Sequence, residues 1–456
     1  MPADSGPVRA DEAERLFAPF FAGCPAEPVA LAVSGGSDST ALMVLFADWV
    51  KEKGIADGKH TVLTVDHGLR PRSGAEAERV AAQAEALGFR HATLVWAGEK
   101  PPSGVQAAAR AARYRLMLAH MHAHGIATLV TAHTEDDQAE TFLMRLARGS
   151  GLDGLCAIAP SVDIRRPGRP GLRIVRPLLA VPKSRLVATL EARGITWIED
   201  PSNRSPAYER TRLRAAAAAL EAAGLTAGAL AASARRLQRA RAAVEAAADA
   251  CCAEPGGMVH TDPAGFFRID RARLAEVPEE VLLRVMARAI AAAGGAGEPV
   301  PLANLEAIVA VLRGNGTEPH SWTLSRAHVT AGAGSIRVER EPGRLPLPVI
   351  RVAAGGAALW DGRFAVEVGA DLRGDLEVRA LGRDGLSHLQ RLGWSGRRSR
   401  ALLLVPSFWQ DGDLVAVPAA GYWARPELAR LIRSEFVGLA YNAWAMAAGL
   451  YNDPGG

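Results

Sequence analysis

The first two hundred residues alternate between short apolar runs rich in β-branched residues and longer segments with helical spacing. Four runs have the length of buried parallel strands, and apolar side chains recur three and four positions apart in the segments between them. The expected strands cover residues 29–33, 61–66, 92–96 and 128–133, and the expected helices cover residues 40–53, 75–87 and 106–124. Strand followed by helix, repeated, predicts an α/β fold with a doubly wound parallel sheet and helices on both faces.

The rest of the chain changes composition several times, and 456 residues are enough for two to four domains. A basic Pro/Gly-rich loop is expected at residues 165–170, and an Ala/Arg-rich helical stretch begins near residue 212. A Pro/Gly-rich linker then precedes a small, mostly β segment. We therefore predict a nucleotide-binding domain at 25–215, a helical connector at 216–253, a second domain at 254–342 and a C-terminal domain at 372–456.

Composition and cysteine usage favour a globular protein of the cytoplasm. The hydrophobic fraction is 49% and the charged fraction 22%, and the first residues lack a basic segment followed by an apolar one. No window approaches the roughly 18 uninterrupted apolar residues that a membrane span needs. The four cysteines form no C-x-x-C pair, which is expected in a reducing compartment.

The segment LAVSGGSDSTALM places two glycines between an expected strand and an expected helix. Gly35 and Gly36 let the backbone turn sharply, and the N-terminus of the following helix adds free N–H donors for an anion. Asp38 would repel a bound phosphate unless a cation stands between them, and Mg²⁺ prefers such oxygen ligands. The absence of a lysine after the glycines excludes a Walker A loop. A serine-rich turn capped by Asp38 is the alternative interpretation. The further hydroxyl donors of this loop are Ser34, Ser37 and Ser39.

The segment TLVTAHTEDDQAET brings a histidine and several acids, among them Asp136, Asp137 and Glu140, to the end of another expected strand. Acidic residues are common at helix N-termini because of the helix dipole, which is the alternative interpretation here. Three acids beside His133 nevertheless exceed what capping alone requires. Either Asp137 or Glu140 would complete a metal site with Asp38, and His133 would orient or deprotonate a substrate group.

Two further groups of polar residues are candidates for nucleotide contact. Gln106, Arg110 and Arg113 share one face of an expected helix, where the arginines would neutralise polyphosphate charge. Asp66 and His67 end the second expected strand, at the sheet edge where ligands bind in such folds. A solvated arginine face and a structural histidine are the respective alternatives.

These motifs together resemble the N-type ATP pyrophosphatases with a PP-loop, and most closely the tRNA(Ile)-lysidine synthetases. The resemblance rests on SGGSDS, VDHGLR, Q-x-x-x-R-x-x-RY, AHTEDDQAET and RGSG, and is strong over residues 28–215. The segment EDPSNRSPAYERTRLR is similar to the family's D-x-x-N…R-x-x-x-R pattern, with Thr211 where the family commonly has Asn. A segment near residues 378–417 is similar to the family's last domain.

The resemblance implies an adenine nucleotide α-hydrolase-like fold and an ATP-dependent modification of tRNA. Such an enzyme adenylates the C2 carbonyl of the wobble cytidine in isoleucine tRNA with a CAU anticodon. Free L-lysine then displaces AMP and forms lysidine. Under this resemblance the ATP-binding residues are Ser34, Gly35, Gly36, Ser37, Asp38, Ser39, Asp66, His67 and Arg110. The resemblance also implies a monomer or homodimer without a membrane partner.

The resemblance further suggests individual catalytic roles. Asp38 and Glu140 would hold Mg²⁺, and Arg113 would stabilise charge that develops during adenylation. His133 would contact the cytosine, and Asp137 would bind the ammonium of lysine.

Contacts with RNA are expected outside the nucleotide site. Residues 204–241 contain eight arginines and two glutamates, and a second arginine cluster surrounds Trp394. Arginines beside an aromatic ring suit phosphate contact and base stacking, although a solvated arginine face is the alternative. The candidate tRNA-binding residues are Asn203, Arg210, Arg212, Arg214, Arg397, Arg398 and Arg400.

Three other classes of protein fit the sequence less well. A tRNA thiolase needs cysteine or iron–sulfur chemistry, and the chain has no C-x-x-C. A synthetase fed by a glutaminase would carry a nucleophilic cysteine elbow, which is not found. A non-catalytic RNA-binding protein would have lost Asp38 or the acidic cluster, and both are intact.

Overall fold

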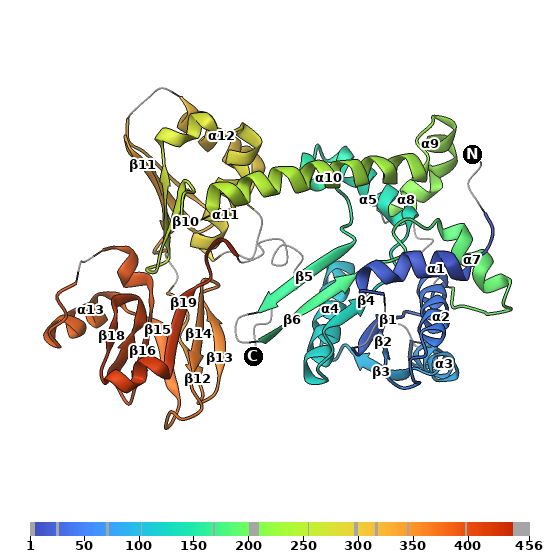
Figure 1. Cartoon of the computed structure of the whole chain (residues 1–456), viewed down its shortest axis with the longest axis horizontal. Coiled ribbons are helices and arrows are strands. Elements are labelled where there is room, and N and C mark those ends of the chain that lie inside the picture. The colour runs from blue at the N-terminus through green and yellow to red at the C-terminus, as the bar shows by residue number, and fades with distance from the viewer. Residues whose placement is uncertain are drawn as a thin grey trace. The chain divides into compact units, whose positions relative to one another are not determined.

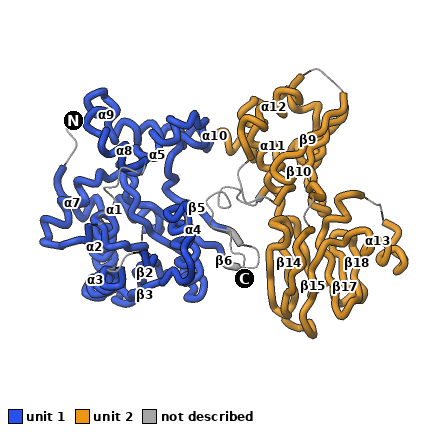
Figure 2. Tube along the Cα trace, turned by 180° about the vertical axis from the view of Figure 1, so that it is seen from behind, with its two compact units in different colours: residues 1–164, 170–242 blue, residues 165–169, 243–456 orange. Residues whose placement is uncertain are grey.

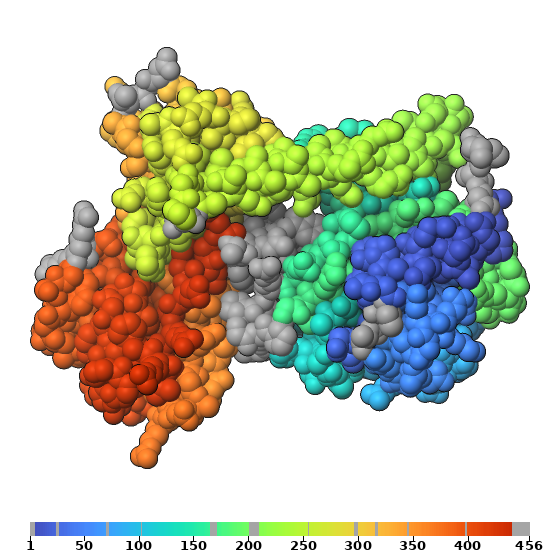
Figure 3. Space-filling model, in the orientation of Figure 1, coloured from blue at the N-terminus to red at the C-terminus, as the bar shows by residue number. Residues whose placement is uncertain are grey.

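The computed structural model describes residues 5–23, 27–69, 73–101, 103–166, 169–199, 209–253, 255–295, 300–314, 318–343, 346–396 and 399–440. The chain forms two compact units, one of residues 1–164 and 170–242 and one of residues 165–169 and 243–456 (Figure 2). The boundary near residue 242 falls inside α10 (Ala227–Cys252), a long helix that lies on the molecular surface (Figure 3). The predicted domains at 254–342 and 372–456 both fall in the second unit, and their boundaries stay a prediction.

The first unit contains a six-stranded sheet with the strand order β3-β2-β1-β4-β6-β5. The strands are β1 (Val29–Ala32), β2 (Thr61–Asp66), β3 (Arg90–Val95), β4 (Thr128–Val130), β5 (Ser161–Arg166) and β6 (Arg169–Val175). Neighbouring strands from β3 to β6 pair in parallel, which confirms the predicted doubly wound α/β fold. The loop expected at 165–170 is wrong in part, because residues 165–166 and 169–170 belong to β5 and β6.

Helices cover both faces of this sheet. They are α1 (Ala10–Phe17), α2 (Ser37–Glu52), α3 (Ser73–Ala86), α4 (Val105–Ala123), α5 (Glu135–Ala147), α6 (Leu152–Leu155), α7 (Lys183–Glu191), α8 (Glu209–Ala215) and α9 (Ala217–Ala222). Figure 1 shows α2 and α4 on opposite sides of β1 and β2. The almost continuous apolar run of α2 is buried because α1 and α7 pack on its outer side. Within the described residues, no helix is both long and apolar enough to cross a membrane.

The direction of the chain through the sheet reverses between β1 and β4. From β1 the chain proceeds outward through β2 and β3, whereas β4 lies on the other side of β1 and leads toward β6. In open α/β sheets, ligands bind at the carboxyl ends of the strands at such a reversal. A ligand-binding site is therefore expected at the residues that follow β1 and β4.

The second unit combines helices with three antiparallel sheets. One sheet has the order β7 (Val259–Asp262), β8 (Phe266–Asp270), β11 (Ser335–Arg340), β10 (Ala327–Ala331), β9 (His320–Leu324). Another has the order β12 (Ile350–Val352), β15 (Leu376–Ala380), β16 (Pro406–Gln410), β17 (Asp413–Val417), β18 (Tyr422–Trp423). The third has the order β13 (Ala357–Trp360), β14 (Phe364–Val368), β19 (Ile432–Phe436). Its helices include α11 (Glu279–Gly294), α12 (Leu302–Arg313) and α13 (Gly382–Arg391).

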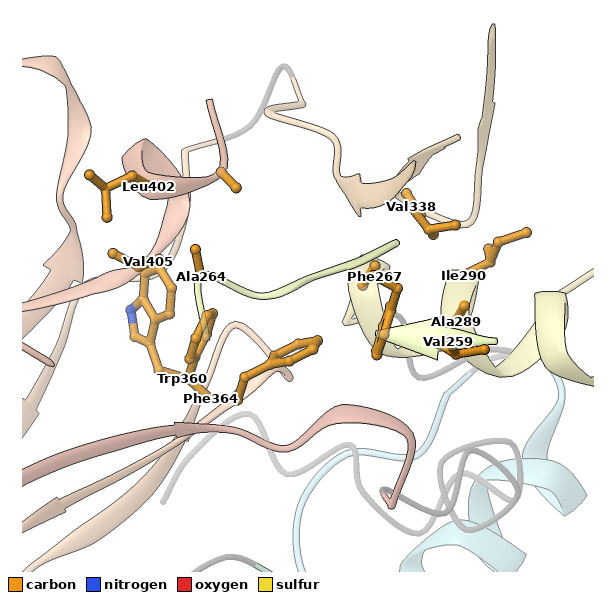
Figure 4. Close-up of a cluster of buried hydrophobic side chains, with 14 of the residues drawn as sticks. Val259, Ala264, Phe267, Ala289, Ile290, Val338, Trp360, Phe364, Leu402 and Val405 are labelled. Carbon is orange, nitrogen blue, oxygen red and sulfur yellow. The ribbon is translucent and has the colours of Figure 1, made fainter. Parts of the chain in front are cut away.

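One hydrophobic core extends through this unit. Phe267 and Ile290 belong to the part built on β8 and α11, whereas Trp360 and Phe364 come from β13 and β14 (Figure 4). All four side chains are fully buried and belong to the same cluster. The sheets of the second unit are therefore held together by continuous apolar packing.

A buried carboxylate adds a polar connection inside this core. The Asp361 side chain is 1% exposed and accepts hydrogen bonds from Arg363 Nε at 2.8 Å, Arg340 Nε at 3.0 Å and Arg326 Nη2 at 3.0 Å. Burial lowers the pKa of Arg363 to about 10, although Asp361 opposes that shift. The three guanidiniums come from different turns and strands, so Asp361 fixes their relative positions.

Replacing Asp361 with alanine should leave Arg340 and Arg363 buried without their anion. We expect Asp361→Ala to lower the free energy of unfolding by about 3–5 kcal/mol, as is found when one partner of a buried ion pair is removed. Urea unfolding followed by near-ultraviolet circular dichroism measures the change, with the solvent-exposed Asp375→Ala as the matched control. A loss no larger than that of the control would contradict a structural role for Asp361.

Candidate functional site

A pocket of about 530 Å³ lies where β1 and β4 end. Tyr114, Lys183, Trp197 and Ile198 line it in addition to residues that the sequence predicts. The predicted site residues that line it are Ser34, Gly36, Ser37, Asp38, Ser39, Arg110, Arg113, His133, Asp137 and Arg210. The parallel sheet thus brings together residues from four separate motifs.

The glycine loop after β1 is fixed by its own backbone and hydroxyl groups. Gly35 has a φ of +85°, and a Cβ at this position would lie 2.5 Å from the Ile198 side chain. Ile198 N also donates to Gly35 O at 2.8 Å. Gly36 is the N-cap of α2, and Ser39 Oγ donates to its carbonyl at 3.1 Å while accepting from Ser34 N at 3.2 Å. The loop therefore needs glycine at position 35 for two independent reasons.

Two of the acids that follow β4 cap helices. Asp137 accepts from Thr134 N at 2.9 Å, while Thr134 Oγ1 accepts from Asp137 N at 3.3 Å, which forms a capping box at the start of α5. Asp136 accepts from Lys183 N at 2.8 Å, at the start of α7. Capping therefore explains the positions of more of these acids than the sequence analysis expects. Asp137 nevertheless also lines the pocket.

Each of the two carboxylates predicted to bind metal contacts a basic side chain. Lys183 Nζ lies 3.3 Å from Asp38 Oδ2, and Arg214 Nε lies 2.5 Å from Glu140 Oε1. Burial raises the pKa of Asp38, the Lys183 ammonium opposes that shift, and repulsion from Asp137 adds to it. Burial likewise raises the pKa of Glu140 against the effect of Arg214.

These contacts bear on a possible metal ion. Among the described residues, no group of three or more His, Cys, Asp and Glu side chains is arranged to hold a metal by itself. Asp38 and Asp137 line the same pocket and repel each other, and a bound cation would relieve that repulsion. Glu140 is not among the lining residues, so Asp38 with Glu140 as the ligand pair stays a prediction.

His133, which lines the pocket, and His67, which does not, both have lowered pKa values and are neutral near pH 7. Burial, followed by the nearby Arg176, lowers the pKa of His133 well below its usual range, and its Nδ1 lies 3.0 Å from Thr131 Oγ1. Burial and Arg113 lower the pKa of His67 to about 4. Neither ring nitrogen of His67 has a hydrogen-bond partner among the described residues.

Asp66 and His67 stand apart from the other predicted nucleotide contacts. Neither lines the pocket, although their neighbour Val65 does. The Asp66 carboxylate accepts from Gly68 N at 2.8 Å, and the His67 ring packs edge-on against Trp96. Their predicted contact with nucleotide has no support from this arrangement.

The predicted RNA-binding residues differ in where they lie. Arg210 lines the pocket, Arg214 pairs with Glu140, and Arg212 and Arg400 are solvent-exposed. Asn203, Arg397 and Arg398 lie outside the described residues.

Trp394 does not stand free for base stacking. Its indole N–H donates to Ala420 O at 2.9 Å, and the ring packs against the hydrophobic core. The stacking role that the sequence suggests for this residue is therefore not supported.

Lys183 is the principal residue of the pocket that the sequence analysis missed. Strand-end motifs did not include it, since it begins a helix, α7, some fifty residues after β4. One signal was available: the chain has only five lysines, and Lys183 is the one that follows residue 100.

Comparison with known proteins agrees with this geometry. Residues 9–219 match the family described as PP-loop domain. The tRNA(Ile)-lysidine synthase of Bradyrhizobium sp. (strain BTAi1) is 44% identical over 75% of this chain and 97% of its own length. That of Methylobacterium sp. (strain 4-46) is 46% identical over 74% of this chain and 96% of its own. That of Ruegeria pomeroyi is 38% identical over 88% of this chain and 90% of its own.

Keeping His67 neutral should make stability depend on pH. Its folded pKa of about 4 lies below the ordinary value of 6.5, so the unfolded chain takes up the proton first. The stabilisation is present above about pH 6.5 and is lost as the pH falls toward 4. Because the side chain is partly exposed, we expect His67 to contribute on the order of 1 kcal/mol to the free energy of unfolding.

Urea unfolding of His67→Gln at pH 7 and pH 4.5 measures that contribution. The variant should lose less stability between the two pH values than the unaltered chain does. His122→Gln, which removes a solvent-exposed histidine of α4, should lose as much as the unaltered chain. Equal losses in all three proteins would refute a buried neutral role for His67.

Proposed function

This chain belongs to the tRNA(Ile)-lysidine synthase family, and on that premise we propose that it converts the wobble cytidine of isoleucine tRNA to lysidine. The tRNA would carry the CAU anticodon, and the reaction would use ATP and free L-lysine. The observation that carries the proposal is the pocket in which the PP-loop, three arginines, a neutral histidine and three carboxylates meet.

The PP-loop and the adjoining helix start supply the nucleotide site. Free N–H groups at the start of α2 and the positive end of its dipole favour the negatively charged phosphates of ATP. Arg110 and Arg113 line the same pocket, where they would neutralise phosphate charge. Arg110 packs against Tyr114, with Cζ 5.4 Å from the ring centroid, which orients its guanidinium.

Magnesium is the cofactor that the carboxylates suit. Asp38 would hold Mg²⁺. Glu140 is the second predicted ligand, and it would have to give up its contact with Arg214 to bind the metal. The repulsion between Asp38 and Asp137 supports a cation in this pocket. When bound, the metal supplies positive charge that stabilises the phosphates during transfer.

The chemistry would proceed in two displacements. The cytosine O2 attacks the α-phosphorus of ATP, the bond to the β-phosphate oxygen breaks, and pyrophosphate leaves. The ε-amine of lysine then attacks C2, the C2–O bond breaks, AMP leaves with the bonding electrons, and the amine loses its proton. Arg113 would stabilise negative charge in the first step.

His133 and Asp137 would position the two acceptors. The neutral imidazole of His133 would contact the cytosine by a hydrogen bond, because its low pKa keeps it uncharged near pH 7. Asp137 would bind the ammonium of lysine. Its carboxylate is held by Thr134, so its position is set before any substrate binds.

Basic residues outside the nucleotide site would hold the tRNA. Arg210, Arg212 and Arg214 lie on α8, and Arg210 also reaches the pocket. Arg400 is exposed on the second unit, and Asn203, Arg397 and Arg398 remain predicted contacts. Arginine side chains would contact phosphates of the backbone, which positions the RNA without reading its sequence.

Mass spectrometry of tRNA nucleosides after incubation with ATP and lysine tests the proposed function. The unaltered chain should form lysidine and release pyrophosphate, and Asp38→Ala should release none while keeping its fold and tRNA affinity. Asp48→Ala, on the far part of the same helix, should retain activity. Absence of lysidine with the unaltered chain would refute the function, and normal pyrophosphate release by Asp38→Ala would refute the role of Asp38.

Replacing Asp137 with asparagine should separate lysine binding from ATP binding. Asparagine keeps an oxygen that can accept from Thr134, so α5 should stay capped, but the negative charge is lost. We expect the KM for lysine to rise by at least about tenfold, which corresponds to one charge-assisted hydrogen bond. The KM for ATP should change by less than about twofold. An equal rise for both substrates would assign Asp137 to the metal site instead.

A further inference from the structure

We propose that Lys183 contacts the phosphates of ATP and that Asp136 is the residue that positions it. The inference rests on the proposed function, because it takes ATP as the ligand of the pocket. It gives a role to Lys183, the lysine among the described residues that line the pocket, and to Asp136, an acid of the cluster that does not line it.

Hydrogen bonds connect the start of α7 to the start of α5. Lys183 is the first residue of α7, and its backbone N–H donates to Asp136 Oδ2 at 2.8 Å. Two residues earlier, Val181 O accepts from Glu135 N at 3.1 Å. These two bonds fix the Cα position of Lys183 relative to the strand end that carries His133 and Asp137.

The Lys183 side chain, in contrast, is only loosely held. Its ammonium lies 3.3 Å from Asp38 Oδ2, and the two side chains are 44% and 26% exposed. Ion pairs with this much exposure to solvent contribute little to stability. Lys183 is therefore free to exchange Asp38 for another anion at little cost.

Phosphate is the anion that the surroundings favour. Asp38 is the second residue of α2, so the ammonium of Lys183 lies next to the helix start that would receive the phosphates. A phosphate group beside Asp38 is repelled by its carboxylate unless a cation lies between them. In the absence of metal, Lys183 supplies such a cation and can contact both Asp38 and a phosphate, and with Mg²⁺ at Asp38 it would contact the phosphate oxygens alone.

A lysine suits this exchange better than an arginine would. Its charge is a compact ammonium at the end of a flexible four-carbon chain, whereas the arginine fork needs two aligned acceptors. Among the described residues that line the pocket, the other positively charged side chains are the arginines Arg110, Arg113 and Arg210. Their planar groups suit fixed contacts, and Lys183 suits a contact that changes partner.

The alternative is that Lys183 only neutralises Asp38. Both interpretations predict weaker ATP binding when the lysine is lost, but they differ when Asp38 is neutralised as well. If Lys183 only offsets the carboxylate, removing both charges should restore binding. If it contacts phosphate, binding should stay weak.

Isothermal titration calorimetry with ATP and with adenosine, in the absence of divalent metal, separates these cases. Lys183→Met should weaken ATP binding by about 10- to 100-fold, the loss expected for one charge-assisted hydrogen bond. Adenosine, which has no phosphate, should bind within about twofold of the unaltered chain. Lys51→Met, an exposed lysine of the same unit, should change neither.

The double variant Lys183→Met/Asp38→Asn decides between the interpretations. We expect it to bind ATP at least about tenfold more weakly than Asp38→Asn alone. Equal affinity of these two variants, or an equal effect of Lys183→Met on ATP and adenosine, would overturn the proposal. Failure of the unaltered chain to bind ATP would overturn the proposed function as well, so the two failures are distinguishable.

The role of Asp136 as a positioning residue is tested by the ratio of the affinity for ATP to the affinity for adenosine. Asp136→Ala removes the acceptor of the Lys183 N–H and should weaken ATP binding several-fold while leaving adenosine unchanged. Asp136→Asn keeps a side-chain oxygen and should restore the ratio. A purely structural role would lower the melting temperature and affect both ligands alike, and that outcome would overturn the assignment.

Discussion

The parallel hydrogen bonding between β1 and β4 is the constraint on which the site depends. Val29 pairs with Thr128 and Leu31 with Val130, so the two strands end at nearly the same level of the sheet. The glycine loop follows one strand, and the segment with His133 follows the other. Residues about a hundred positions apart in the chain therefore share one pocket. The pairing of the two strands holds them there, so no direct contact between their side chains is needed.

Helix capping gives the site its rigidity. The same acidic side chains that satisfy free N–H groups of α5 and α7 also set the positions of catalytic candidates, since Asp137 is held by Thr134 and Asp136 holds Lys183. Capping and function are thus not competing explanations for this cluster. A carboxylate whose position is fixed by a cap loses less entropy when it binds a substrate.

The local parts of this architecture were predictable from sequence, and the tertiary pairings were not. The hydrophobic pattern locates β2 and most of α2 because burial on both sides leaves continuous apolar runs. The turn composition of residues 165–170 predicts a loop, yet pairing with neighbouring strands draws four of these residues into β5 and β6. Strand ends also indicate Asp38 and His133. Spacing along the chain says nothing, however, about the Arg214 that reaches Glu140 or the Lys183 that reaches Asp38.

The close contact between Gly35 and Ile198 limits how this protein can diversify. Any side chain at position 35 would have to displace the side chain of Ile198, which lines the same pocket, and would also strain the backbone at its positive φ. Single substitutions in the loop are thus coupled to residues far along the chain, and they are poor starting points for adapting the site. A designer who wishes to alter which nucleotide is accepted would do better to begin with α4, where Arg110, Arg113 and Met117 line the pocket from a regular helix.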